Sequence, residues 1–245
     1  MDHCVLSAEM LVKRFGAVTV ADNLSVTLGH AEALGVIGPN GAGKSSFFNL
    51  LSGNIRADSG RILLEGRDVT NASPNERAIA GIGRTYQIPR PFSQLTVFEN
   101  LLVGAFFGAR MDARRAQQHC YETLALTGLL RHADKPAAAL SLLERKRLEL
   151  ARALATRPKV LLLDEIAGGL TEGEAAELVA TIQSIHAHGT AIIWIEHVVH
   201  ALLAVVSRLM VLSFGKKLME GEPSAVMNSA AVRDVYLGIE VEAHA

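Results

Sequence analysis

The hydrophobic pattern divides the chain into alternating segments of expected strand and expected helix. Apolar and polar residues alternate over residues 4–28 in two segments that break at Phe15-Gly16, which predicts an antiparallel hairpin. Uniformly apolar runs, typical of buried parallel strands, follow later. They cover residues 33–37, 191–195 and 209–212, and a fourth run at 160–165 ends in two carboxylates. With shorter strands at 61–66 and 82–87, this alternation predicts an α/β fold with a mostly parallel core sheet.

Residues 92–157 have a helical pattern that no strand pattern interrupts. A capping box starts at Thr96, with Glu99 three residues later, and further helices are expected at 114–126 and 141–155. Helices outside this region are expected at 47–53, 74–80, 172–186 and 198–206. We therefore expect one domain, in which an α/β core of residues 1–87 and 158–245 carries an inserted helical subdomain of residues 88–157.

Composition and charge limit the classes of function. The chain has 245 residues, 49% of them hydrophobic, which is enough for a substantial core. Lys and Arg number 24 against 25 Asp and Glu, which argues against a protein that binds nucleic acid through bulk charge. Cys4 and Cys120 lack metal or redox spacing and fit a reducing cytosol. We find no signal-peptide pattern and no apolar run approaching the length of a membrane span.

A glycine-rich stretch between an expected strand and an expected helix carries the clearest chemistry. Residues 38–46 read Gly-Pro-Asn-Gly-Ala-Gly-Lys-Ser-Ser, the spacing of a phosphate-binding P-loop. Glycines let backbone N–H groups converge on one point, and the helix N-terminus adds partial positive charge. Lys44 is expected at the β- and γ-phosphates, and the Ser45 hydroxyl at Mg²⁺. The candidate nucleotide-binding residues here are Gly38, Pro39, Asn40, Gly41, Ala42, Gly43, Lys44, Ser45 and Ser46.

Two adjacent carboxylates end the apolar run at 160–165. Asp164 and Glu165 fall where a buried parallel strand reaches its carboxyl edge. Asp164 can hold Mg²⁺ through water there, and Glu165 can polarise an attacking water. Because adjacent carboxylates repel each other without a cation, a bound metal explains the pair.

Three features admit two interpretations each. Phe15, at the hairpin turn, fits a core side chain or an aromatic that stacks on a nucleotide base. His197 directly follows the expected strand 191–195 and fits a structural histidine or a donor to a γ-phosphate. Ten Lys/Arg against five acids between Arg110 and Arg157 fit a solvated face, or a surface for anionic lipid or an acidic partner.

Taken together, these residues resemble the ATP-binding cassette of ABC transporters over nearly the whole chain. The resemblance implies that the P-loop is Walker A and that residues 161–165 are Walker B, with Glu165 catalytic. It places Gln87 as the Q-loop glutamine beside the metal and His197 as the switch histidine. It also places Phe15 as the adenine-stacking aromatic, and residues 168–171 as the D-loop.

Three shorter motifs point to a narrower group within that superfamily. Residues 84–87, Arg-Thr-Tyr-Gln, and 95–100, Leu-Thr-Val-Phe-Glu-Asn, resemble the ATP-binding subunits of branched-chain amino acid importers. So do residues 235–238, Val-Tyr-Leu-Gly. Of the two ATPases that such importers usually carry, the chain resembles the longer type. The lipopolysaccharide-export ATPase is a close relative that shares much of the sequence of these motifs.

Two positions depart from the family pattern. The signature, usually Leu-Ser-Gly-Gly-Gln, is Leu140-Ser141-Leu142-Leu143-Glu144 here. Ser141 and Glu144 form a capping box, so a helix start is expected without glycine. Ser141 is kept as a candidate phosphate contact, but the altered signature predicts a weaker site across the dimer. Ile166 replaces the proline usual after Walker B, which predicts only a change in loop stiffness.

The resemblance implies a P-loop ABC cassette with a core sheet, an N-terminal antiparallel β subdomain and an inserted helical subdomain. The implied function is ATP hydrolysis that energises an importer for branched-chain or related amino acids, with ATP and Mg²⁺ as cofactors. The implied partners are permease subunits, contacted by residues 87–107, and a second, different cassette or a second copy. A periplasmic solute-binding protein takes part indirectly, and the location is the cytoplasmic face of the inner membrane.

Alternative functions are tested by features of the sequence. An exporter of the lipopolysaccharide type stays open. A non-transport ABC ATPase on ribosomes or DNA usually has tandem cassettes or long charged insertions, whereas this chain has one P-loop and near-zero net charge. A GTPase is disfavoured because no Asn-Lys-x-Asp occurs. The sequence does not name the solute.

Overall fold

The larger of two sheets forms the centre of the molecule. The computed structural model describes residues 4–234, and the motif at 235–238 lies outside them. This sheet has six strands, in the order β10-β9-β3-β8-β7-β6. Their bounds are β10 (Lys216–Gly221), β9 (Arg208–Ser213), β3 (Ala33–Ile37), β8 (Ala191–Ile195), β7 (Val160–Asp164) and β6 (Ile82–Arg84). All neighbours are parallel except β10, which pairs antiparallel with β9. The predicted mostly parallel core sheet is confirmed.

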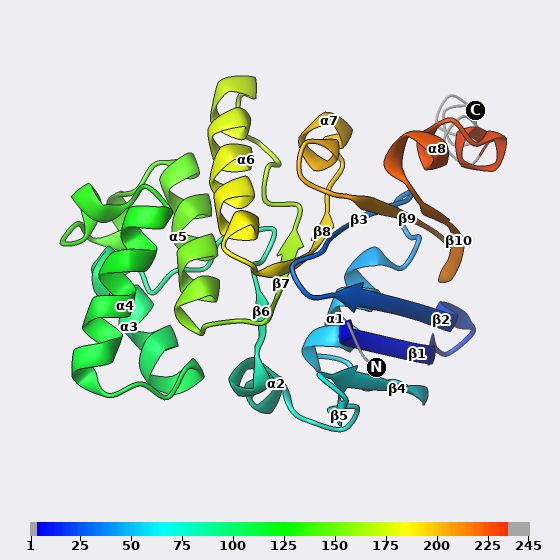
Figure 1. Cartoon of the computed structure of the whole chain (residues 1–245), viewed down its shortest axis with the longest axis horizontal. Helices are drawn as coiled ribbons and strands as arrows, with labels where there is room; N and C mark the ends of the chain where they lie inside the picture. The colour runs from blue at the N-terminus through cyan, green and yellow to red at the C-terminus, as the bar shows by residue number, and fades with distance from the viewer. Residues whose placement is uncertain (1–3, 235–245) are drawn as a thin grey trace.

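The smaller sheet is antiparallel and has the order β2-β1-β4-β5. Its strands are β1 (Cys4–Phe15), β2 (Val18–Gly29), β4 (Ser59–Leu64) and β5 (Arg67–Asp68). The predicted hairpin is confirmed, with its turn at Gly16, whose φ of 57° suits glycine. Figure 1 shows this sheet at one end of the molecule, with the core sheet between it and the helical region.

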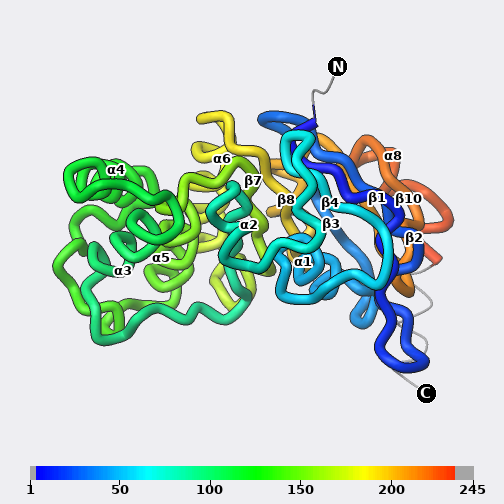
Figure 2. Tube along the Cα trace, turned by 90° about the horizontal axis from the view of Figure 1, so that it is seen from below, coloured from blue at the N-terminus to red at the C-terminus, as the bar shows by residue number. Residues whose placement is uncertain are grey.

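Helices and the second sheet cover the two faces of the core sheet. On one face Leu34 and Val36 pack with α1 (Lys44–Ser52) and with the antiparallel sheet. On the other face Ala33 and Ile37 pack with α6 (Glu172–Ala187) and its neighbours. Figure 2 shows α1 and α2 on the near side of the molecule. The remaining helices of the core are α2 (Pro74–Ala80), α7 (Val199–Leu203) and α8 (Pro223–Met227). Because both faces are covered, these strands are uniformly apolar.

The region after β6 is helical and has its own hydrophobic cluster. Its elements are α3 (Val97–Val103), the π-helical turn η1 (Gly104–Gly108), α4 (Ala113–Leu126), the short turns η2 (Leu130–His132) and η3 (Ala137–Ala139), and α5 (Leu142–Ala155). Thr96 and Ser141 cap α3 and α5 with complete capping boxes, as the spacing predicts. Its cluster includes Val97, Leu101 and Leu148. Figure 1 shows α3, α4 and α5 grouped at the end opposite the antiparallel sheet.

Some element bounds differ from those predicted. The strand expected at 82–87 ends at Arg84, because the next residues leave the sheet edge toward the carboxylates of β7. The helix expected at 198–206 is limited to α7, Val199–Leu203. β10 and α8 were not predicted, since β10 is largely exposed and lacks a clear alternation. No helix among residues 4–234 combines the length and the apolar character needed to cross a bilayer.

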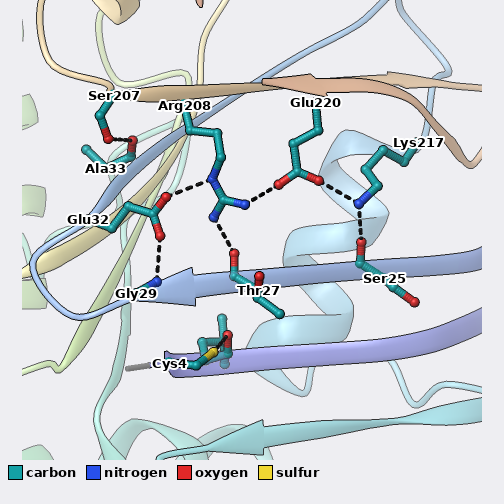
Figure 3. A network of polar contacts seen from close by, with 11 residues as sticks. Cys4, Ser25, Thr27, Gly29, Glu32, Ala33, Ser207, Arg208, Lys217 and Glu220 are labelled. Atoms are coloured by element: carbon teal, nitrogen blue, oxygen red, sulfur yellow. Dashed lines mark hydrogen bonds and ion pairs between the residues drawn. The ribbon is translucent and has the colours of Figure 1, made fainter. Parts of the chain in front are cut away.

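A polar network joins the two sheets away from the P-loop (Figure 3). Arg208 on β9 donates to the Thr27 carbonyl of β2 at 2.5 Å and to Glu32 at 2.7 Å, and it also pairs with Glu220. Lys217 on β10 donates to the Ser25 carbonyl at 2.9 Å and to Glu220 at 2.5 Å. The network therefore fixes β2, which also contacts the P-loop, against β9 and β10.

Candidate nucleotide-binding and hydrolysis site

The P-loop runs from the end of β3 to the start of α1 and is tightly packed at Gly38 and Gly43. A Cβ added to Gly38 (φ 154°) would lie 2.2 Å from the Leu212 carbonyl oxygen of β9. One added to Gly43 (φ 101°) would lie 2.5 Å from the Val20 carbonyl oxygen of β2. Neither contact is tolerable, so glycine is required at both positions. The loop is therefore held between the two sheets, with Gly43 at the N-terminus of α1.

Lys44 lies against the loop that precedes it. Its side chain is only 6% exposed, and its ammonium donates to the carbonyls of Gly38 at 2.7 Å and Pro39 at 3.0 Å. Burial lowers the pKa of Lys44, and the nearby Glu165 and Asp164 carboxylates oppose that shift. The lysine is thus adjacent both to the phosphate-binding loop and to the carboxylates at the end of β7.

Asp164 ends β7 in a buried ion pair that sequence reasoning missed. Arg84, from the end of β6, donates to Asp164 at 2.9 Å and to Asn49 of α1 at 2.7 Å. The Asp164 N–H donates to the Thr85 hydroxyl at 3.2 Å. The signal available in the sequence was an arginine within the strand expected at 82–87. Because Arg84 bridges β6, β7 and α1, it fixes the Asp164 carboxylate relative to the P-loop helix.

The three predicted catalytic residues Gln87, Glu165 and His197 meet at the Glu165 carboxylate. The Gln87 amide donates to Glu165 Oε2 at 2.5 Å, and His197 Nε2 lies 2.8 Å from Glu165 Oε1. An imidazole with a proton on Nε2 would donate to an ionised carboxylate across this distance. Glu165 has φ of 45°, a conformation that non-glycine residues seldom adopt and that clusters at functional sites. The carboxylate is therefore fixed by two side chains from separate segments.

A further glutamate, Glu196, was also missed from the sequence and connects the loops on either side of this cluster. Glu196 is buried after β8 and accepts hydrogen bonds from the N–H groups of Ala167 and His197, both at 3.0 Å. It thereby ties the loop after Glu165 to the loop that carries His197. The only signal for it was its position directly before His197.

Phe15 is exposed at the end of β1. Half of its surface is accessible, and the Lys13 ammonium lies 5.2 Å from its ring centroid. The interpretation as a core phenylalanine is therefore wrong. Its role as a base-stacking aromatic stays a prediction, consistent with an accessible ring face.

The oxygen groups near the P-loop suit Mg²⁺ held jointly with phosphates. No cluster of three or more His, Cys, Asp or Glu residues within 4–234 could bind a metal alone. Mg²⁺ in nucleotide sites usually takes one or two carboxylates, with phosphates and water supplying the other ligands. Asp164 offers one carboxylate beside Lys44, and the Ser45 residue is exposed at the start of α1. This donor set fits a magnesium ion that arrives with a nucleotide.

Comparison with known proteins decides the family. Residues 21–168 match the family model described as "ABC transporter". The chain belongs to the ABC transporter family of ATP-binding cassettes. It is an ATP-hydrolysing cassette that serves as a transporter subunit, and such cassettes work with permeases and dimerise.

Similar proteins cover the cassette along its whole length. It is 36% identical to the high-affinity branched-chain amino acid transport ATP-binding protein LivG of Salmonella typhimurium, over 97% of this chain and 99% of that one. It is 33% identical to the lipopolysaccharide export system ATP-binding protein LptB of Haemophilus influenzae, over 96% and 97%. Among solved structures, the ADP conformation of an ATP-binding cassette of an ABC transporter matches with a TM-score of 0.88 and 30% identity, over 97% and 100%. The predicted fold class is confirmed.

The altered signature of this cassette is a closed helix cap. The Glu144 N–H donates to Ser141 Oγ at 3.3 Å, and the Ser141 N–H donates to Glu144 Oε2 at 2.8 Å. His132 and Lys135 pair with the same carboxylate at 2.9 and 3.3 Å. The hydrogen bond from the Ser141 N–H is the largest cause of the lowered pKa of Glu144. Two donors at this end are thus already used, and the first residue of the helix, Leu142, is 46% exposed.

Proposed function

We propose that this cassette is the ATP-hydrolysing subunit of an importer for branched-chain or related amino acids. The observation that carries the proposal is the full-length similarity to LivG, at 36% identity against 33% for LptB. The proposed location is the cytoplasmic face of the inner membrane. The proposed complex contains permeases, a second cassette and, outside the membrane, a periplasmic solute-binding protein.

The site residues take the following roles in this proposal. The P-loop N–H groups and Lys44 hold the phosphates of ATP, and Phe15 stacks on its base. Ser45, Asp164 and Gln87 offer oxygen atoms to Mg²⁺, which neutralises phosphate charge. Glu165 accepts a proton from the attacking water, and His197 donates to the γ-phosphate. The observed contacts of Glu165 with Gln87 and His197 support this assignment, since all three converge on one carboxylate.

The proposal is tested by uptake in cells that lack this chain. Uptake of labelled leucine, isoleucine or valine should be lost and should return with the wild-type gene, but not with Glu165→Gln. Normal uptake together with a defect in lipopolysaccharide at the outer membrane would favour the exporter. Normal behaviour in both assays, with RNA or DNA co-purifying, would favour a non-transport ATPase.

A cleft between the core and the helical region is the proposed permease-docking surface. A cavity of about 200 Å³ is lined by residues of α2, β6 and α5, including Tyr86, Glu149 and Arg152. The guanidinium of Arg152, one of the lining residues, lies 5.0 Å from the ring centroid of the exposed Phe92. Ile88 is 68% exposed in the same segment. Val97, which we had included in this surface, is fully buried in the helical core and is excluded from it.

Ile88→Glu is expected to uncouple transport without removing basal ATPase activity. An unpaired carboxylate at an apolar contact costs several kcal/mol, so capture of the permease should weaken by roughly 100-fold at about 1.4 kcal/mol per tenfold. The measurements are pull-down of the permease, solute uptake and ATPase activity of the free cassette. Leu218→Glu is the matched control, because Leu218 is also an exposed apolar residue but lies on β10, at the edge of the core sheet opposite β6. Normal capture and uptake with Ile88→Glu would place the docking surface elsewhere.

The signature supports pairing with a different cassette. Two N–H groups at the start of α5 are occupied by the capping box, and Leu142 limits close approach. The Lys135 ammonium offsets the charge of Glu144, so obstruction weakens this phosphate site more than repulsion. A partner with a glycine signature would complete the site on this chain's P-loop, and the opposite site would be slower.

Restoring the family signature is expected to raise turnover of the assembled complex. The variant Leu142→Gly, Leu143→Gly, Glu144→Gln frees donors for phosphate, and one charge-assisted hydrogen bond contributes about 1.5–3 kcal/mol. A gain of roughly tenfold at the slow site follows. Glu144→Gln alone, which removes the charge but keeps both leucines, is the control. If a homodimer of this chain matches the full complex in rate and the restored signature adds nothing, the pairing with a different cassette is wrong.

A further inference from the structure

Lys146 is a buried lysine on α5 that none of the roles above uses. Its residue is 4% exposed, one and a half helical turns after the capped start of α5. Its ammonium donates to the Gln87 carbonyl at 3.0 Å and lies 3.5 Å from the Glu165 carbonyl. Both acceptors are main-chain atoms, and both belong to residues of the hydrolysis site. A helix of the inserted region therefore reaches the backbone of two site residues with one side chain.

These contacts belong to a network of hydrogen bonds around Glu165. The Gln87 amide donates to the Glu165 carboxylate at 2.5 Å, while Lys146 contacts the carbonyls of both residues. The Glu165 carbonyl also accepts from the Gly168 N–H at 3.3 Å, and the Glu165 N–H donates to the Ile195 carbonyl at 2.8 Å. Within this network of hydrogen bonds, Lys146 is the residue contributed by α5. Displacing it would act on Gln87 and Glu165 together.

The charges around Lys146 explain why a cation occupies this position. Burial lowers the pKa of Lys146, and Glu196, Glu165 and Glu149 oppose that shift, in that order. Glu149 lies three residues later on α5 and pairs with Arg152 at 3.0 Å. Burial also raises the pKa of Glu149. A neutral side chain in place of Lys146 would remove this nearby cation from Glu196 and Glu165, whereas Glu149 would keep Arg152.

Other contacts of α5 show which parts of the core would be affected if this helix moved. Leu150 and Leu154, in the second half of the helix, pack in the cluster on one face of the core sheet. Near its start, Arg147 pairs with Glu177 of α6 at 2.8 Å, on the exposed side. Lys146 is therefore a buried contact between α5, whose capped end carries the signature, and the main-chain carbonyls of Gln87 and Glu165.

We infer that Lys146 is a positioning residue through which the signature helix sets the place of Gln87 and Glu165. When the start of α5 shifts, the ammonium changes its contact with both carbonyls, and the Glu165 carboxylate moves into or out of line with the attacking water. The inference rests on the proposed role of Glu165. It adds a direct link between the signature end of α5 and hydrolysis.

The test compares Lys146→Met with Arg145→Met in the assembled complex. Both variants remove one cation from α5, but Arg145 is exposed and donates to the Ala138 carbonyl, away from the site. A misplacement of about 1 Å can cost roughly 100-fold in rate. Lys146→Met should therefore lower kcat about 10- to 100-fold, with little change in KM for ATP. Arg145→Met should leave both unchanged, and Lys146→Arg should recover much of the lost kcat.

A double-mutant cycle separates this inference from the role of Glu165. If Lys146 acts through Glu165, Lys146→Met should cause little further loss in a Glu165→Gln background. Full additivity, an unchanged kcat, or a change confined to KM would overturn the inference. Loss of turnover from Lys146→Met with none from Glu165→Gln would instead refute the proposed role of Glu165.

Thermal unfolding shows whether the fold is intact. If Lys146→Met does not fold, Lys146→Gln, which keeps an amide donor, takes its place and is expected to show the same kcat-specific loss. A folded Lys146→Gln with wild-type kcat would overturn the inference.

Discussion

Glu165→Gln is expected to lower ATP turnover by about 10²–10⁴-fold, the usual contribution of a general base. Glutamine keeps the size and one oxygen acceptor of the side chain but cannot take a proton from water. The neighbours Gln87 and His197 can each still form a hydrogen bond with it, so the site should keep its shape. ATP should stay bound, since the P-loop and Lys44 are unchanged.

The measurement is steady-state turnover and equilibrium ATP binding of the assembled complex. Glu172→Gln is the control, because Glu172 is exposed in the first turn of α6 and makes the same change of charge. A closed dimer that accumulates with ATP would support the assignment. Turnover near that of the wild type would exclude Glu165 as the base.

Local signals account for the parts of the fold that the sequence predicted well. Capping boxes at Thr96 and Ser141 use side chains three residues apart, so they can be read directly from the sequence. The helix at Pro74–Ala80 has proline in its first turn and a glycine just after its end. The apolar runs of β3, β7 and β8 are buried on both faces, which gives them a pattern that needs no tertiary information.

Long-range polar contacts account for the parts that the sequence did not predict. Arg84 and Asp164 lie 80 residues apart, and Lys146 and Gln87 lie 59 apart, so no local spacing indicates either contact. Lys146 had been counted only with a basic region whose simplest interpretation was a solvated face, yet it is buried. β10 was missed because its residues are exposed or only partly buried, and because it forms a strand by pairing with β9.

The residues of the candidate site likewise divide into those that the sequence predicts and those that only the structure reveals. The P-loop follows a fixed spacing of glycines and lysine, each with a backbone or phosphate reason, so its residues could be named from the sequence alone. Gln87, Glu165 and His197 come from three separate segments, and only the family resemblance placed them together. The supporting residues Arg84 and Glu196 belong to no short motif, and only the folded chain shows that they fix the carboxylates.

Lys44→Ala is expected to remove most ATP affinity while the fold survives. A lysine that donates to phosphate makes charge-assisted hydrogen bonds worth about 1.5–3 kcal/mol each, so the loss should be roughly 100-fold or more at about 1.4 kcal/mol per tenfold. In this structure the lysine also has a local role, since its ammonium donates to the Gly38 and Pro39 carbonyls. We therefore expect a small fall in Tm beside the loss of binding.

Binding and stability must be measured together to separate these two effects. Lys159→Ala is the matched control, because Lys159 is exposed just before β7 and pairs with Glu65, at the end of the strand away from Asp164. The control should lose its surface ion pair but keep its ATP affinity, since exposed pairs contribute about 0–1 kcal/mol to stability. Removal of Lys44 also takes a cation from beside Asp164 and Glu165, whose mutual repulsion then grows. An equilibrium affinity for ATP equal to that of the wild type, in a folded Lys44→Ala protein, would refute the assignment of Lys44 to the phosphates.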